Sequence, residues 1–188
     1  MFSNTAARLA LAGAILGLVI GHAEASGAVQ GTAASDAYMV TTGRTAQPIG
    51  HYEFCRDHIA ECSVRSLTKT RVSLTPALWN QLVSVNASVN LAITPATDEE
   101  VYGRPEVWAY PTTRGDCEDL VLLKRRDLIE KGWPVGDLLI TVVRQRNGDG
   151  HAVLTVLTDR GDLILDSLQP RVLVWSDTDY EYVKRQSE

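Results

Sequence analysis

The chain has 188 residues, of which 45% are hydrophobic, and a formal net charge of −5. This length suits one folded domain and leaves no room for two full cores. The acidic balance argues against a nucleic-acid partner, because phosphate binding needs a basic face. After the N-terminal segment no apolar run approaches the roughly 20 residues that a membrane span needs, so we expect no mature transmembrane anchor.

Residues 1–25 have the pattern of an export signal. Arg8 is the only charge before an apolar run over residues 9–20, and Ala23-Glu24-Ala25 then supplies a small-x-small cleavage site. An uncleaved membrane anchor is the alternative, although the run is short for one. We expect a signal peptide at residues 1–25 and a periplasmic mature protein.

The three cysteines divide into a pair and a single thiol. Cys55 and Cys62 lie seven residues apart, and Cys117 follows much later. In an oxidising compartment the simplest partition is a Cys55–Cys62 disulfide that leaves Cys117 free and potentially reactive. Alternatively, the pair stays reduced or binds zinc with His51 and His58, although the spacing matches no common zinc module.

The N-terminal part of the mature chain shows little periodicity. Residues 26–50 are predicted to form a loosely ordered arm with one edge strand at Tyr38–Thr41. Residues 51–188 then form the domain, which begins with a small disulfide loop at residues 51–66.

A helix is predicted from Thr75 to about Ile93. Thr75 is the N-cap, Pro76 occupies the first helical position, and an apolar stripe follows at Leu78, Leu82, Val85 and Val89. The long connection over residues 94–115 is of a kind that is uncommon unless it is functional. Trp108 in this connection could wall a substrate cleft or pack against the next helix.

Strands follow in the second half. Leu138–Val143, His151–Leu157, Leu163–Leu165 and Val172–Trp175 are β-rich runs separated by turn residues. Helices followed by an antiparallel meander indicate an α+β fold.

Cys117 stands at the start of a predicted amphipathic helix. Gly115-Asp116 supplies a loop and an N-cap, and apolar residues recur from Leu120 with helical spacing up to the stop at Gly132. Backbone N–H groups at a helix start stabilise a thiolate, which makes Cys117 a candidate nucleophile. A small buried hydrophobe is the ordinary role of such a cysteine.

His151 and Asp166 are the candidate partners of this thiol. His151 opens a strand after a turn and Asp166 closes the next strand, so a base and its orienting carboxylate follow Cys117 in papain-like chain order. A tight turn at residues 158–162 would place Asp166 opposite Leu154 or Thr155. That position is roughly 10–13 Å along the strand from His151, so a bulge or crossed strands would be needed.

Three carboxylates, on Asp116, Glu118 and Asp119, surround the thiol in the sequence. They oppose its ionisation. Helix capping explains all three simply. The alternative is that they bind calcium, with carbonyls or waters completing the oxygen shell.

Several motifs together resemble the bacterial transglutaminase-like cysteine proteinases, which include the LapG-type periplasmic proteases. They are Gly115-Asp116-Cys117-Glu118-Asp119, Gly150-His151-Ala152-Val153-Leu154, Gly161-Asp162 through Leu165-Asp166, Phe54-Cys55 with Glu61-Cys62, Val85-Asn86 with Val89-Asn90, and Trp108.

The resemblance implies a papain-like, transglutaminase-type core with a catalytic triad of Cys117, His151 and Asp166. It also implies calcium at Asp116 and Glu118, with Asp119 a further candidate. LapG-type members cleave a surface adhesin and are controlled by a membrane receptor that senses cyclic di-GMP.

We therefore expect an exported, calcium-dependent cysteine endopeptidase. Its oxyanion hole would use the Cys117 backbone N–H and a second donor on the Trp108 loop. Two alternatives stay open. One is acyl transfer by a transglutaminase or amidase that acts on cell-wall peptide, and the other is a calcium-dependent binding module whose thiol is incidental.

Overall fold

The computed structural model describes residues 36–63 and 71–187, so the predicted signal peptide lies outside the described residues. The helices are α1 (Ile49–Asp57), α2 (Ile59–Ser63), α3 (Pro76–Ala92), α4 (Asp98–Tyr102) and α5 (Cys117–Glu130). The strands are β1 (Thr94–Pro95), β2 (Arg114–Gly115), β3 (Leu138–Arg144), β4 (Gly150–Thr158), β5 (Gly161–Leu165), β6 (Leu173–Val174) and β7 (Glu181–Arg185).

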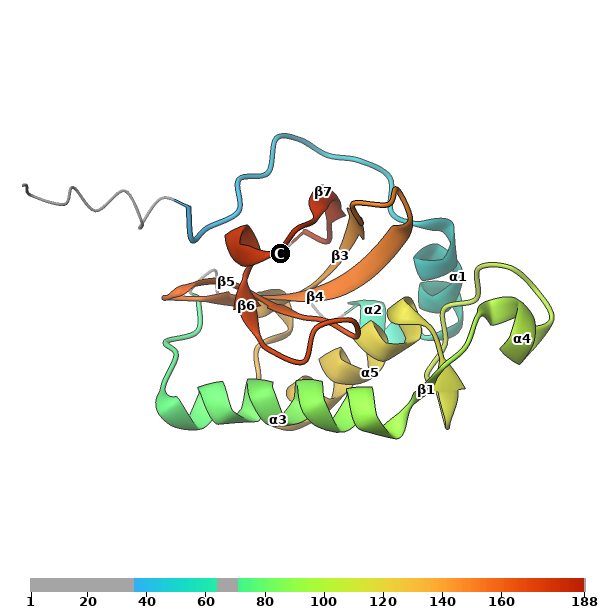
Figure 1. The fold of residues 1–188 in the computed structure, drawn as a ribbon, viewed down its shortest axis with the longest axis horizontal. Helices are drawn as coiled ribbons and strands as arrows, with labels where there is room; N and C mark the ends of the chain where they lie inside the picture. Colours follow the sequence, from blue (N-terminus) through green and yellow to red (C-terminus); the bar gives the residue numbers. More distant parts are fainter. Residues whose placement is uncertain (1–35, 64–70, 188) are drawn as a thin grey trace, which may run out of the picture. The chain divides into compact units, whose positions relative to one another are not determined.

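The fold is α+β, as the sequence predicts. An antiparallel sheet has the strand order β6-β5-β4-β3-β7, and α3 and α5 pack together beside it (Figure 1). β7 was not predicted; it returns to pair with β3 at the edge opposite β6. The sheet is therefore a four-strand meander with one added edge strand.

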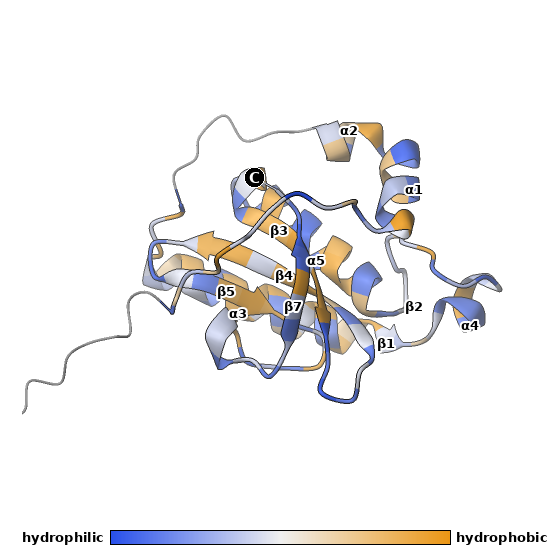
Figure 2. Ribbon diagram, turned by 90° about the horizontal axis from the view of Figure 1, so that it is seen from above, coloured by the Kyte–Doolittle hydropathy of each residue, from blue (hydrophilic) through white to orange (hydrophobic). Residues whose placement is uncertain are grey.

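The two long helices begin where the sequence places them. The Thr75 side chain accepts a hydrogen bond from the Leu78 backbone N–H at 3.2 Å and caps α3. The apolar faces of α3 and α5 bury Leu82, Val85 and Leu128 against one face of the sheet. Figure 2 shows the central strands largely in hydrophobic colours, which agrees with a β4 that is buried along almost its whole length.

Two expectations for the N-terminal part are wrong. Tyr38–Thr41 forms no strand, because polar groups of the arm bond to Asp159 in the β4–β5 turn and to the Asp162 side chain in β5 instead of to a strand ladder. The Met39 backbone N–H donates to Asp162 Oδ2 at 3.0 Å, and the Tyr38 hydroxyl donates to the Asp159 carbonyl at 2.7 Å.

The segment expected as a disulfide loop is helical over its described part, as α1 and α2. Phe54 buries its ring in the main core, which favours a helix that presents this face inward. A Cys55–Cys62 disulfide joins the two helices, with the Cα atoms 5.4 Å apart. Within residues 36–63 and 71–187, no helix has the length and apolar character to cross a membrane.

Candidate active site

Cys117 is the first residue of α5 and its side chain is half-buried. Gly115, the last residue of β2, leaves little room for a side chain, because a Cβ there would lie 2.7 Å from Asp119 Oδ2. The Cys117 thiol donates to Glu118 Oε2 at 2.9 Å. Burial, followed by the Glu118 charge, raises the pKa of this thiol well above its usual range, although a backbone hydrogen bond from Ala152 opposes the shift.

His151 and Asp166 are in direct contact. The His151 Nε2 and Asp166 Oδ1 atoms lie 2.7 Å apart, and both side chains are almost fully buried. The β4–β5 register pairs Leu154 with Leu165, which places Asp166 one step beyond the ladder and opposite Val153. The predicted offset of three or four residues from His151 is therefore wrong.

The smaller offset follows from a tighter turn, in which Thr158 pairs directly with Gly161. Asp166 and His151 thus form a diagonal cross-strand pair, with Cα atoms at a typical separation of roughly 7–8 Å. They also share a face, because side chains alternate along each strand. No bulge between β4 and β5 is needed for the two side chains to meet.

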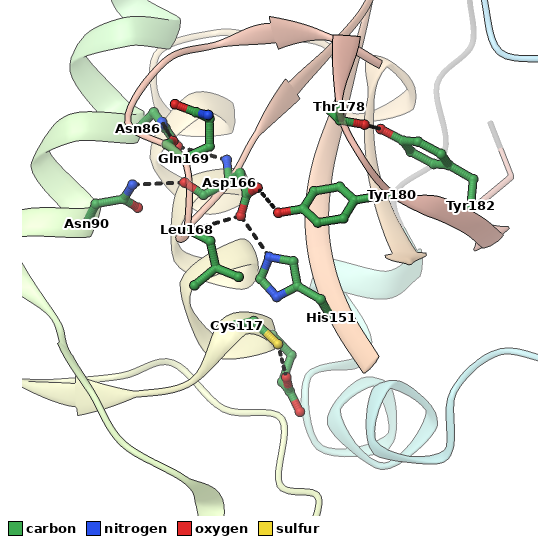
Figure 3. Close-up of polar contacts among 11 residues, drawn as sticks. Asn86, Asn90, Cys117, His151, Asp166, Leu168, Gln169, Thr178, Tyr180 and Tyr182 are labelled. Carbon is green, nitrogen blue, oxygen red and sulfur yellow. Dashed lines mark hydrogen bonds and ion pairs between the residues drawn. The ribbon is translucent and has the colours of Figure 1, made fainter. Parts of the chain in front are cut away.

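The imidazole of His151 lies between the Asp166 carboxylate and the Cys117 sulfur (Figure 3). An ionised carboxylate only accepts hydrogen bonds, so the proton of the neutral ring sits on Nε2. This leaves Nδ1 unprotonated, on the side of the ring that faces the sulfur in Figure 3, while the thiol itself donates to Glu118.

Asp166 is held as an anion by further donors. The Leu168 backbone N–H donates to Oδ1 at 2.9 Å and the Tyr180 hydroxyl donates to Oδ2 at 2.6 Å. Burial alone would raise the pKa of Asp166, but the hydrogen bonds from His151 and Tyr180 outweigh it and lower the pKa below its ordinary value.

Three carboxylates gather beside the thiol: Asp98, Asp116 and Glu118 each offer an oxygen within 4.8 Å of the other two. Asp116 occupies the N-cap position of α5 yet makes no side-chain cap bond, and its Oδ1 is buried without a hydrogen-bond partner. Asp98 Oδ1 is also buried without a hydrogen-bond partner.

Burial raises the pKa of Asp116 to about 8, with the Glu118 and Asp98 charges adding to the effect. Burial also raises the pKa of Glu118. Buried carboxylate oxygens without donors are what a hard cation requires, so this set fits calcium.

Asp119, the third predicted ligand, does not join this set. Its Oδ1 accepts from the Ala109 backbone N–H at 2.8 Å and its Oδ2 accepts from the Tyr102 hydroxyl at 3.1 Å. Burial raises its pKa to about 7. Both oxygens are already used to hold the connection between α4 and β2 against α5, which gives Asp119 a structural role.

Trp108, predicted to wall a substrate cleft or to pack against the helix, lies in the core with 7% of its surface exposed. Its Nε1–H donates to Glu106 Oε1 at 3.0 Å, and its ring meets His51 of α1 edge-on. It borders a cavity of about 1220 Å³ that extends between the N-terminal arm and β3–β7. Cys117, His151 and Asp166 do not line that cavity, so it is separate from the thiol.

The sequence model of the bacterial transglutaminase-like cysteine proteinases matches residues 41–188. The chain belongs to this family. It is a cysteine peptidase. No curated protein matches the sequence of this proteinase.

Solved structures of Legionella pneumophila LapG are similar to the proteinase. The calcium-bound form is 25% identical in sequence, with 76% of this chain and 78% of that chain covered and a TM-score of 0.52. A second LapG structure has 26% identity, the same coverage and a TM-score of 0.51. An EGTA-treated form has 26% identity, 73% and 74% coverage, and a TM-score of 0.50.

Sequence reasoning missed two residues around the proteinase site. Asp98 is distant from Cys117 in the chain. The Thr97–Glu100 capping box, which predicts the start of α4, is the only sequence signal near it. Lys124 of α5 is fully buried, and its Nζ has no hydrogen-bond partner among the described residues. Its position three residues after Val121 and four before Leu128, on the apolar stripe, was the available signal.

Proposed function

We propose that this proteinase is an exported, calcium-dependent cysteine endopeptidase that uses Cys117, His151 and Asp166 as a catalytic triad. Cys117 is the nucleophile, His151 the general base and then acid, and Asp166 the residue that orients the imidazole. The observation that carries the proposal is the 2.7 Å contact between His151 Nε2 and Asp166 Oδ1, on a ring whose other nitrogen faces the sulfur.

The reaction proceeds in two stages. His151 Nδ1 takes the Cys117 proton as the sulfur bonds to the peptide carbonyl carbon; the C–N bond then breaks and the proton passes to the leaving amine. Water next attacks the thioester with its proton going to His151, the C–S bond breaks, and the proton returns to the sulfur. The Cys117 backbone N–H, which has no partner within α5 because it lies in the first turn, is the expected oxyanion donor.

Asp98, Asp116 and Glu118 would hold the calcium ion, whose positive charge offsets the repulsion between these carboxylates and the thiolate. The buried, unpartnered oxygens of Asp98 and Asp116 support this assignment. So do the LapG structures, which include a calcium-bound and an EGTA-treated form.

Export by the signal at residues 1–25 would place the enzyme in the periplasm. Its substrate would be a protein there or at the cell surface. The resemblance to LapG-type proteases extends the proposal to a large surface adhesin as substrate and to control by a membrane receptor that senses cyclic di-GMP.

The test compares cells that produce the native chain with cells that produce Cys117→Ala, in calcium and in EGTA. New protein N-termini in the periplasm and at the surface are labelled and identified. We expect a small set of termini that needs both Cys117 and calcium. Identical termini in all samples contradict the proposal, and incorporation of a labelled amine instead of hydrolysis would indicate acyl transfer.

A further inference from the structure

Asp166 is buried, but its backbone lies outside the hydrogen-bond ladder of the sheet. β5 ends at Leu165, so β4 supplies no hydrogen bonds to the peptide groups on either side of Asp166. Asp166 is 2% exposed, and a buried N–H or C=O without a partner is costly. Other groups must therefore satisfy this backbone and fix where it leaves the sheet.

Two asparagines of α3 do this. The Asp166 backbone N–H donates to Asn86 Oδ1 at 3.0 Å, and Asn90 Nδ2 donates to the Asp166 carbonyl at 2.8 Å (Figure 3). Asn86 and Asn90 are one helical turn apart and so lie on the same face of α3. One amide acts as acceptor and the other as donor, which is the pair of bonds that a neighbouring strand would otherwise make.

Asn86 also fixes the chain after Asp166. It is fully buried, and its Nδ2 donates to the carbonyls of Gln169 and Pro170 at 3.1 and 3.3 Å. The same loop carries the Leu168 N–H that bonds to the Asp166 carboxylate. The α3 amides thus hold both the backbone of Asp166 and the turn that supplies one of its carboxylate donors.

The placement matters because Asp166 reaches His151 diagonally. The carboxylate has to span an offset of two residues along β4, so a small shift of its backbone changes the 2.7 Å contact with the imidazole. Displacements of about 1 Å can slow a catalysed reaction by about 100-fold.

We propose that Asn86 and Asn90 are positioning residues of the active site, which act through Asp166 on the orientation of His151. This inference rests on the proposed triad. Neither asparagine touches the sulfur or the imidazole through any contact that the structure records, so their effect is transmitted by the Asp166 backbone.

Asn90→Leu is the main variant, because it removes the amide but keeps the branching at Cγ, in a side chain that is only half-buried. Gln81→Leu is its matched control. Gln81 is also an α3 amide with one inter-element hydrogen bond, accepting from Trp133 Nε1 at 2.9 Å, but it lies outside the site. Asn86→Asp is a second variant that keeps the acceptor and removes the donors.

The first readout is the proton NMR signal of the imidazole N–H that bonds Asp166, identified by its loss in His151→Gln. It needs no substrate. We expect the signal to shift or exchange faster in Asn90→Leu and to remain unchanged in Gln81→Leu at equal thermal stability. An unchanged signal in both Asn90→Leu and Asn86→Asp would overturn the inference.

The second readout is the rate at which iodoacetamide labels Cys117 at pH 7 in calcium. We expect the rate to fall about tenfold or more in Asn90→Leu and to stay within twofold in Gln81→Leu. A moved NMR signal with an unchanged labelling rate would also overturn the positioning role. Failure of the endopeptidase proposal would be seen in a different measurement, because the native chain would then show no Cys117-dependent cleavage.

Discussion

Replacement of Lys124 by methionine tests the electrostatics of the buried face of α5. Lys124 is fully buried and its ammonium has no hydrogen-bond partner. Burial lowers the pKa of Lys124 to about 7, although the Asp166 charge opposes the shift. Between pH 7 and the unfolded value near 10.5, the unfolded chain carries a proton on this lysine that the folded chain lacks, so folding becomes more favourable as pH rises there.

The cost of the buried charge is fully present below about pH 7 and disappears above about 10.5. A pKa unit corresponds to about 1.4 kcal/mol, so the whole cost has an upper limit of roughly 5 kcal/mol. Replacement of buried charges by apolar residues of similar volume typically stabilises by about 1–4 kcal/mol. We therefore expect Lys124→Met to raise the free energy of unfolding by roughly that amount at pH 7.

Urea unfolding, followed by tryptophan fluorescence at pH 7, 8 and 9, measures this. The contributions of the other titrating groups cancel when the free energy of unfolding of the native chain is subtracted from that of Lys124→Met. This difference should shrink by about 1.4 kcal/mol per pH unit at most. Lys131→Met, at the exposed end of the same helix, is the control for the loss of one lysine charge. A less stable Lys124→Met at pH 7, or a difference independent of pH, would refute the reasoning.

Two further changes test the acidic cluster and the packing of α1. Asp116→Asn removes a buried carboxylate whose pKa is raised to about 8. In EGTA we therefore expect the free energy of unfolding to rise by about 1 kcal/mol, which is roughly 2–4 °C in melting temperature. Adding calcium should raise the melting temperature of this variant no further. A calcium-dependent rise equal to that of the native chain would speak against the cation site. Gly50→Ala places a Cβ 2.3 Å from Trp108 Cδ1 and should destabilise by about 1–3 kcal/mol in thermal unfolding, whereas Gly43→Ala, with nothing within 4 Å, should change little. Equal stability of these two variants would contradict the packing of α1 on Trp108.

The parts of the fold that were predictable are those with strong local signals. Thr75-Pro76 and the stripe after it define α3, and the apolar runs of β3, β4 and β5 define the sheet core. β7 is an edge strand that is exposed or half-buried along its length, so tertiary pairing with β3 rather than periodicity specifies it.

α1 shows the same limit of local signals. It begins without a side-chain cap and has a glycine in its first turn. Packing of Gly50 against Trp108 and the disulfide hold it, and neither is visible in a local pattern.

The site was predictable as a set of residue types but not as a set of contacts. Cys117, His151 and Asp166 follow from their places at element ends, yet the register that joins the last two depends on a turn one residue tighter than expected. Asp98 reaches the cluster only because β1 and β2 pair and bring α4 beside the start of α5. Such long-range placements carry no sequence period.

The most direct test of the account is the rate at which iodoacetamide labels Cys117 in calcium at neutral pH, measured by intact mass for the native chain and for His151→Gln. The account predicts rapid, stoichiometric labelling of the native protein and labelling slower by at least about tenfold in the variant, because the imidazole takes the thiol proton. Equal rates in the two proteins would contradict the claim that His151 activates Cys117.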